Sequence, residues 1–353
     1  MQLDQTHVVI RLRKFTEIGD LSLIMIRRYP GALLIGFGMG AIGWAILNTL
    51  LLGWIPWEES IYGLDDEAAS GEVARYLVWM TLLVILQTPA ASVFATFYLG
   101  QAVFEKRPTW KYVTNEVRRQ FMRWFWVLGV RRLAVPAMIL LAFRWGQPVS
   151  GFWDFFVPLL ILLWITVVRA NRPFAPEIML LEQCPLRSKS ESVITMSKRS
   201  KSLHSPMSSE LTGRFASVAL ISAVLVLSCF YTLICFRGIT LGYWYFMNLT
   251  VLLVFFPLSL WLVASVSVII RLLNYLDTRI RLEGWEVELA VRAESLRQFG
   301  NEQQVLAPTQ STSAQSTSAQ STSAQSTSTK STSSQTTSSR KPTASTAQNP
   351  GAV

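Results

Sequence analysis

Few residues in this sequence have the type and spacing that enzymatic chemistry needs. The chain has 353 residues but only two histidines, His7 and His204, which lie far apart without cysteine or carboxylate partners at metal-ligand spacing. A G-x-S-x-G elbow, an H-E-x-x-H pair and a phosphate-binding G-x-x-x-x-G-K loop are all missing from the sequence. We therefore expect a non-enzymatic protein that uses no metal and no cofactor.

Three glycines, Gly38, Gly40 and Gly43, have the G-x-G-x-x-G spacing of a dinucleotide-binding turn. The context of such a turn is missing, because these glycines lie inside a 28-residue uncharged run. Ala32, Gly36 and Gly40 instead form a stripe of small residues at four-residue intervals, which allows two membrane helices to approach closely. We interpret this stripe as a helix-packing surface.

Long uncharged runs predict that the protein spans a membrane. Of its residues 51% are hydrophobic and only 15% are charged, whereas about a quarter are charged in a soluble domain. Runs of roughly 20 apolar residues are long enough to cross a bilayer. We therefore predict an all-α, polytopic helical bundle within residues 30–270. Its six expected spans are residues 30–55, 77–104, 126–146, 151–168, 215–236 and 243–270.

The third and fourth predicted spans contain uncharged runs that are shorter than a bilayer crossing needs. Their runs, Leu133–Phe143 and Phe155–Val168, are about 11 and 14 residues long. The side chains of Arg132 and Arg144 can extend toward opposite headgroups and cover most of the missing length. If this hairpin does not span, both members are lost together and four spans remain.

The distribution of lysine and arginine predicts the orientation of the bundle. Of the 32 basic residues, 29 lie before the first span, between the second and third, between the fourth and fifth, or after the sixth. The other connections contain only Arg75, Arg144 and Arg237. Basic segments resist transfer across the membrane. We therefore predict a multi-pass protein of the bacterial inner membrane with both termini in the cytoplasm.

The segment between the second and third predicted spans is the strongest candidate for a binding surface. Val113, Val117, Phe121 and Trp124 recur every three or four residues, as in an amphipathic helix on a membrane surface. We expect its cations to contact anionic lipid headgroups or a cytoplasmic protein, and we expect no nucleic-acid partner, because the basic residues are spread over short segments. The candidate contact residues are Lys106, Arg107, Lys111, Arg118, Arg119 and Arg123.

A polar kink in the second predicted span supports an alternative function. Gln87 and Thr88 stand beside Pro89 in an otherwise apolar run. Polar residues at a helix break line the substrate pathway in many transporters. A small-solute transporter or channel is therefore the alternative to a lipid-binding or partner-binding protein.

The two ends of the chain are expected to lie outside the bilayer. Residues 1–29 are predicted to be a cytoplasmic segment. Residues 271–299 are predicted to form a cytoplasmic amphipathic helix, in which Asp277 and Arg281 have the i,i+4 spacing of an ion pair. Residues 300–353 consist mainly of Ser, Thr, Gln and Ala, with a repeating QSTSA unit, and are predicted to be disordered.

The layout of the chain resembles a known membrane domain. FYLGQAVFEKRPTWKYVTNEVRRQF and PEIMLLEQCPLRSKSESVITMSKRSKSLH each link two predicted spans through an amphipathic segment, and YLDTRIRLEGWEVEL follows the last span. In these features residues 20–299 resemble the six-helix membrane domain that precedes the catalytic barrel in some bacterial glycerophosphodiester phosphodiesterases, and related stand-alone membrane proteins. The resemblance implies the six-helix layout but no catalytic residues, because a barrel needs some 200 further residues with metal-binding side chains.

Overall fold

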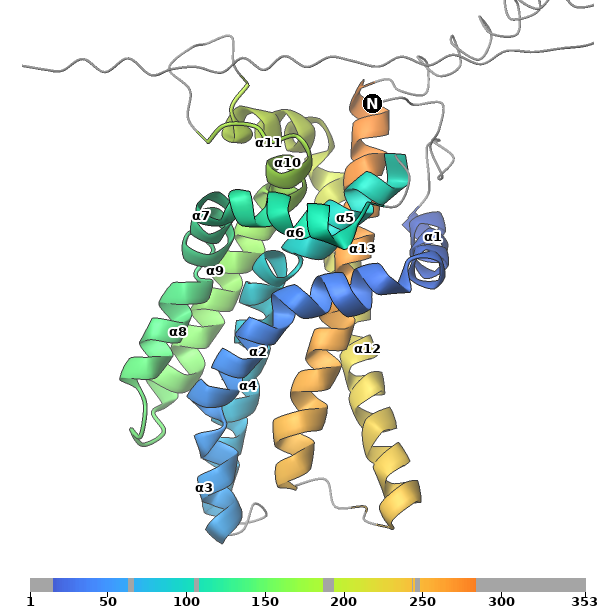
Figure 1. The fold of residues 1–353 in the computed structure, drawn as a ribbon. Helices are drawn as coiled ribbons and strands as arrows, with labels where there is room; N and C mark the ends of the chain where they lie inside the picture. The colour runs from blue at the N-terminus through green and yellow to red at the C-terminus, as the bar shows by residue number, and fades with distance from the viewer. Residues whose placement is uncertain are drawn as a thin grey trace, which may run out of the picture. The chain divides into compact units, whose positions relative to one another are not determined.

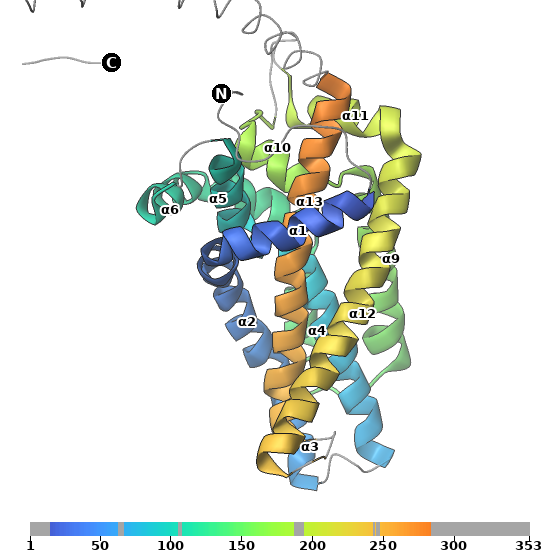
Figure 2. The ribbon, with the colours of Figure 1, turned by 90° about the vertical axis from the view of Figure 1, so that its right-hand side faces the viewer.

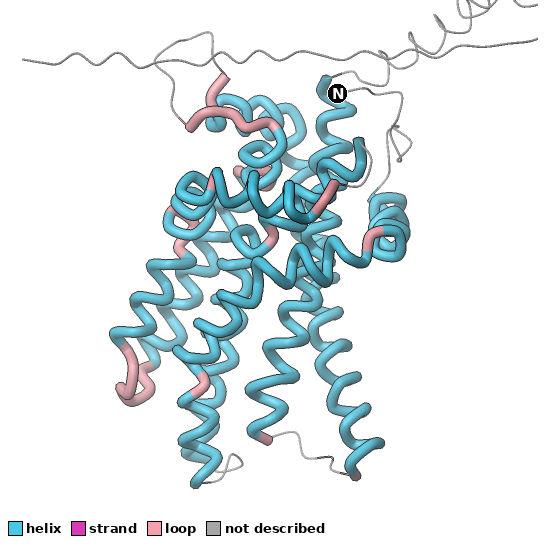
Figure 3. Tube along the Cα trace, viewed as in Figure 1, coloured by secondary structure: helices cyan, strands magenta, loops and turns pink. Residues whose placement is uncertain are grey.

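The computed structural model describes residues 15–62, 67–104, 108–186, 194–242, 244 and 248–283. In this part of the chain every regular element is a helix, which confirms the all-α prediction (Figures 1 and 3). The predicted disordered tail, residues 300–353, lies outside the described residues.

The helices follow one another with short connections. Their bounds are α1 Phe15–Arg28, η2 Ala32–Phe37, α2 Gly38–Leu52, α3 Trp54–Tyr62, α4 Glu67–Ala91, α5 Val93–Phe104, α6 Trp110–Arg119, α7 Phe121–Trp124, η3 Phe125–Val130, α8 Ala134–Phe143, η4 Gly151–Phe156, α9 Val157–Asn171, α10 Ala175–Leu181, α11 Met196–His204, η5 Ser205–Met207, α12 Ser208–Leu241, η6 Val251–Phe255 and α13 Phe256–Glu283. The elements η2, η3, η4 and η6 are π-helical, and η5 is a 3₁₀ turn.

Five helical segments in the described residues are long and apolar enough to cross a membrane. They are Ala32–Ile61, Ala69–Ala91, Gly151–Asn171, Met196–Leu241 and Val251–Leu282. A sixth span is reached if Phe121–Val130 and Ala134–Phe143, which are bent by 61° at a short break, count as one. The protein is therefore a multi-pass helical bundle with five or six candidate spans.

One predicted helix is less continuous in the structure than expected. The helix expected over residues 77–104 is interrupted at Ser92, three residues after Pro89, which cannot donate the backbone hydrogen bond of a regular helix. The helix expected over residues 271–299 continues the last spanning helix as far as it is described, since α13 runs without interruption to Glu283. The expected ion pair between Asp277 and Arg281 forms within α13, with a distance of 3.0 Å between Nε and Oδ2.

The long helices run lengthwise, whereas α1 and α6 lie across the bundle (Figures 1 and 2). Helix α9 ends and α12 begins at the end that carries α10 and α11, which is the top in Figure 1. We call it the α10 end. Helix α1 buries Ile18 and Met25 and exposes Leu23 and Ile24, so it presents apolar side chains on two sides.

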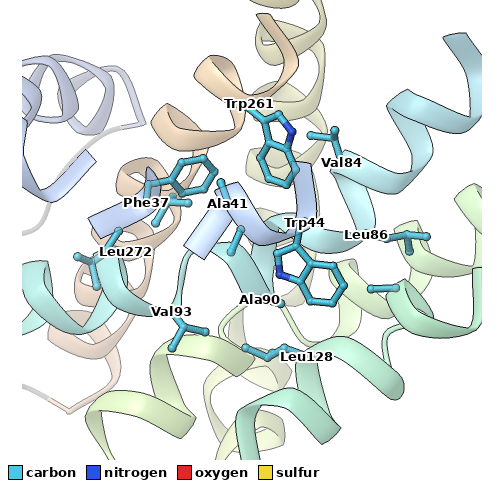
Figure 4. Packing of buried hydrophobic residues seen from close by; sticks show 14 of the residues in the cluster. Phe37, Ala41, Trp44, Val84, Leu86, Ala90, Val93, Leu128, Trp261 and Leu272 are labelled. Atoms are coloured by element: carbon cyan, nitrogen blue, oxygen red, sulfur yellow. The ribbon is translucent and has the colours of Figure 1, made fainter. Parts of the chain in front are cut away.

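A continuous apolar core joins α2, α4, α5 and α13. Figure 4 shows Phe37 and Trp44 of the first span pointing into this core, where the ring of Phe37 lies 5.9 Å from that of Trp261. Close packing is possible because Gly40 lies against the backbone of Ala91, so closely that an added Cβ would lie 2.0 Å from its carbonyl oxygen. Helix α2 is thus held directly against α4.

The same stripe of small residues continues toward α5. Ala32 is fully buried, and a Cβ added at Gly36 would lie 3.0 Å from the ring of Trp110 and 3.2 Å from the Cα of Ala95. All three small residues therefore lie where a larger side chain would separate the first span from its neighbours.

Candidate functional site

The predicted basic surface is only partly visible in the structure. Lys106 and Arg107 lie outside the described residues. On α6, Lys111, Arg118 and Arg119 are exposed, and the side chain of Arg119 is 79% accessible. Arg123 is half-buried and donates a hydrogen bond to the carbonyl oxygen of Gln183 at 3.3 Å.

The apolar face of α6 is turned inward. Val113 and Val117 are buried, whereas Tyr112, Phe121, Met122 and Trp126 are exposed beside the cations. Exposed cations next to exposed aromatic and aliphatic side chains are typical of a helix lying at the headgroup level of a membrane.

A second cationic cluster, which the sequence did not reveal, lies inside the bundle. A cavity of about 610 Å³ is enclosed by α4, α9, α12 and α13, within the roughly 300–1,000 Å³ range of small-molecule pockets. Its wall is mainly apolar along α12 and α13. At the α10 end the wall contains four arginines, Arg132, Arg169, Arg214 and Arg271.

The cavity lies beside the middle of α12, where the helix packs only loosely against the bundle. The helix buries Leu211 and Arg214 at one end and Ile234, Arg237 and Gly238 at the other, and no residue between Arg214 and Ile234 is buried. The bundle therefore stays open along the middle of α12.

The wall of the cavity reaches the outer surface of the bundle. Leu162 of α9 is 38% exposed and Leu227 of α12 is 57% exposed, and both line the cavity. In a membrane this surface faces lipid. A lipid-soluble molecule could thus enter from the side.

The proline of α4 fixes the position of Arg169. Pro89 has no N–H group, so the carbonyl oxygen of Ile85, four residues earlier, loses its partner within the helix. The guanidinium of Arg169 donates a hydrogen bond to this oxygen, while its Nε is buried without a partner. The carbonyl oxygen that Pro89 leaves without a partner in α4 thus binds one cavity arginine, Arg169.

A strained turn follows Arg132, another arginine of the cavity wall. Arg132 is only 5% exposed, and it donates a hydrogen bond of 2.9 Å to the carbonyl oxygen of Arg172 at the end of α9. The next residue, Leu133, has a φ of 66°, in the left-handed region that costs a non-glycine residue about 1–2 kcal/mol. Such strain persists where the surrounding structure imposes it, often at functional sites.

The other two cavity arginines are paired with carboxylates. Nε of Arg271 lies 2.6 Å from Oε1 of the fully buried Glu177, and another nitrogen of its guanidinium donates to Ser92 Oγ at 2.9 Å. Arg214 lies 2.8 Å from Asp277 and 2.6 Å from Glu210. These pairs neutralise Arg271 and Arg214.

Arg132 and Arg169 have no such partner. Among the described residues no carboxylate forms an ion pair with either of them, and each donates only to a backbone carbonyl. The positive charges of Arg132 and Arg271 act on Arg169, so the cluster also repels itself. The buried Arg132 and the half-buried Arg169 therefore keep unused N–H donors and have no directly paired counter-charge beside a mainly apolar cavity.

A separate network at the α10 end is centred on Glu182, which follows α10 and lies outside the spanning segments. Arg199 Nε donates to Oε2 of Glu182 at 2.7 Å, and the hydroxyl of Tyr275 donates to Oε1 at 2.6 Å. Burial by itself raises the pKa of Glu182, but these hydrogen bonds and the charge of Arg279 outweigh it and hold that pKa below its ordinary value of 4.5. This network joins α11 to α13.

Gln87 and Thr88, the polar residues on which the transporter alternative rests, form hydrogen bonds within the packed helices. Within the buried interface of α2 and α4, Asn48 Nδ2 donates to Gln87 Oε1 at 2.8 Å, and Gln87 Nε2 donates to Asn48 Oδ1 at 2.7 Å. Thr88 donates to the carbonyl oxygen of Val84 at 2.6 Å in its own helix, and it also lines the cavity. The described part of the chain brings no three His, Cys, Asp or Glu side chains together as metal ligands.

No family model, curated protein or solved structure matches this chain.

Proposed function

We propose that this multi-pass protein is a non-enzymatic protein of the bacterial inner membrane that binds an anionic amphiphile in the cavity between α4, α9, α12 and α13. Its headgroup contacts Arg132 and Arg169, and its apolar chain lies along α12 and α13. The observation that carries this proposal is a pair of arginines, the buried Arg132 and the half-buried Arg169, which form no ion pair with a described carboxylate and lie at one end of a mainly apolar cavity.

Two arginines inside a membrane protein are costly to keep without a counter-charge. Transfer of one ion into a protein interior costs several kcal/mol even after relaxation, and an ionisable residue inside a membrane protein is a functional-site candidate by default. Guanidinium groups bind phosphate and carboxylate groups through two parallel hydrogen bonds. An anionic headgroup would supply the missing counter-charge.

The location fits a lipid rather than a water-soluble anion. Basic pockets between membrane helices on the cytoplasmic side are recognised binding sites for anionic headgroups. The predicted orientation, with both termini in the cytoplasm, puts the α10 end on that side. The exposed cations of α6, Lys111, Arg118 and Arg119, would attract the anionic leaflet to the same end, with about 1 kcal/mol for each charge near the surface.

Native mass spectrometry of the full chain in mild detergent tests the proposal. Wild-type protein mixed with a phosphatidylglycerol and phosphatidate mixture should retain one anionic lipid after activation. The Arg132→Gln/Arg169→Gln variant should retain none. The matched control is Arg118→Gln/Arg119→Gln, which removes two exposed cations from α6 and should keep the bound lipid.

Two outcomes would overturn the proposal. One is that wild-type protein retains no anionic lipid at any lipid concentration used. The other is equal retention by wild type and the Arg132→Gln/Arg169→Gln variant while that variant elutes as a folded, monodisperse species.

A further inference from the structure

The charges at the α10 end of the cavity specify the charge of the headgroup. Glu177 neutralises Arg271 in a contact of 2.6 Å. Arg214 belongs to a group of four with Arg281, Asp277 and Glu210. In that group Asp277 lies 2.8 Å from Arg214 and 3.0 Å from Arg281, and Glu210 lies 2.6 Å and 3.3 Å from the same two arginines. Within this group, counted over the described residues, two positive and two negative charges are paired.

In the described part of the cavity wall, Arg132 and Arg169 then remain without an ion pair of their own; the carboxylate of Glu177 also attracts Arg132, but its single charge is shared with Arg271. Together they contribute two positive charges to a region where the other ionised groups of the wall cancel in pairs. A ligand with one negative charge would leave one guanidinium group buried and unneutralised, which is costly in a low-dielectric interior. A ligand with two negative charges would neutralise both.

We infer that the cavity selects a lipid phosphomonoester, whose headgroup carries close to two negative charges, over a lipid phosphodiester, which carries one. A phosphomonoester has a second pKa of about 6, so at neutral pH it has a charge of about −1.5 to −2 and three strong acceptor oxygens. This inference rests on the proposed function, because it specifies the headgroup for the same cavity.

The hydrogen-bonding capacity of the two arginines agrees with this choice. A guanidinium has five N–H donors in a planar fork, of which Arg169 uses one on Ile85 and Arg132 one on Arg172. Two forks facing one phosphate need several acceptor oxygens. The three free oxygens of a phosphomonoester can accept from both forks, whereas esterification of one oxygen removes a charged acceptor.

Binding of two matched lipids to the purified full chain in nanodiscs of neutral phosphatidylcholine tests this inference. The probes are dioleoyl phosphatidate and dioleoyl phosphatidylmethanol, which have the same acyl chains and differ by one methyl ester and one negative charge. Wild-type protein should bind phosphatidate at least about tenfold more tightly, the factor that corresponds to about 1.4 kcal/mol. Glycerol 3-phosphate, which has the headgroup without the chains, should bind far more weakly than either lipid.

Single substitutions assign the selectivity to the unpaired arginines. In Arg169→Gln, or equally in Arg132→Gln, one of the two charges is removed, and the preference for phosphatidate should fall below about threefold while phosphatidylmethanol still binds. Arg118→Gln, on the surface of α6, should keep the full preference.

The outcomes distinguish a failure of the proposed function from a failure of the phosphomonoester inference. Failure of both lipids to bind wild-type protein contradicts the proposed function. Equal affinity for the two lipids, or an unchanged preference in both single variants, contradicts the phosphomonoester inference alone. Binding of glycerol 3-phosphate as tight as that of phosphatidate would show a site for a soluble phosphate and overturn the lipid assignment.

Discussion

Replacing Arg169 with glutamine should stabilise the ligand-free protein and weaken its stabilisation by anionic lipid. The substitution removes one hydrogen bond from a charged group, to the carbonyl oxygen of Ile85, which is worth about 1.5–3 kcal/mol. It also removes a buried charge without a carboxylate partner, whose desolvation costs several kcal/mol, and its repulsion with Arg132 and Arg271. The second effect is larger, so we expect a net gain of about 1–3 kcal/mol.

Thermal unfolding of delipidated protein in detergent measures this gain. On the scale of soluble domains of 150–250 residues, about 1–3 kcal/mol corresponds to a rise in Tm of roughly 2–12 °C. Addition of an anionic lipid at about 100 times its Kd should stabilise wild-type protein by about 2.7 kcal/mol and the variant by much less. Lipid should therefore raise the Tm of wild-type protein by more than that of the variant.

The matched comparison is Arg271→Gln, the same substitution at a neighbouring arginine that is paired. This change leaves Glu177 as a buried carboxylate without its partner, so it should destabilise the ligand-free protein by about 3–5 kcal/mol. If Arg169→Gln instead lowers the Tm of the ligand-free protein as Arg271→Gln does, Arg169 is a structural residue. In that case the reasoning from uncompensated charge is refuted.

Three further predictions concern the scaffold of the site. Gly40→Ala should destabilise the protein by about 1–3 kcal/mol because the new Cβ would collide with backbone, whereas Gly43→Ala, in the same helix with open space around it, should be neutral or stabilising by up to about 1 kcal/mol; equal Tm values would contradict this packing. Asn48→Leu or Gln87→Leu should each cost about 1–3 kcal/mol by leaving one amide unpaired, but the double variant should recover most of the loss, and additive losses in the cycle would argue against the pair. The contribution of Glu182 should be fully present above its ordinary pKa of 4.5 and be lost as the pH falls through its lowered folded pKa, so unfolding between pH 6 and pH 3 should show a stability loss that Glu182→Gln reduces; identical pH profiles would contradict the network.

The spanning helices could be predicted from the sequence because apolar runs of sufficient length have few alternatives in a bilayer. The helix-packing stripe was also visible, since small residues at four-residue intervals lie on one face of a helix. The apolar pattern of the last span ends at residue 270, before Arg271, but in the structure that arginine is paired with Glu177 and α13 continues through it.

The arginine cluster could not be predicted because arginines at helix ends normally extend toward headgroups. Arg132 was assigned to the membrane boundary for this reason. Whether such side chains turn inward depends on acceptors far away in the sequence, the carbonyl oxygens of Ile85 for Arg169 and of Arg172 for Arg132, which no local pattern encodes. One signal was present: Pro89 leaves the carbonyl oxygen of Ile85 without a partner in its helix, so a donor from another helix was to be expected there.

Photo-cross-linking tests the presence of lipid in the cavity most directly. Phosphatidate with a photoactivatable group on its acyl chain would be bound to the full chain in nanodiscs, illuminated, and its adducts mapped by mass spectrometry. If the cavity binds this lipid, adducts will concentrate on Val218–Leu227 of α12 and Leu162–Thr166 of α9, and they will disappear in the Arg132→Gln/Arg169→Gln variant. Adducts spread evenly over the exposed faces of α2 and α9, and unchanged in that variant, would contradict it.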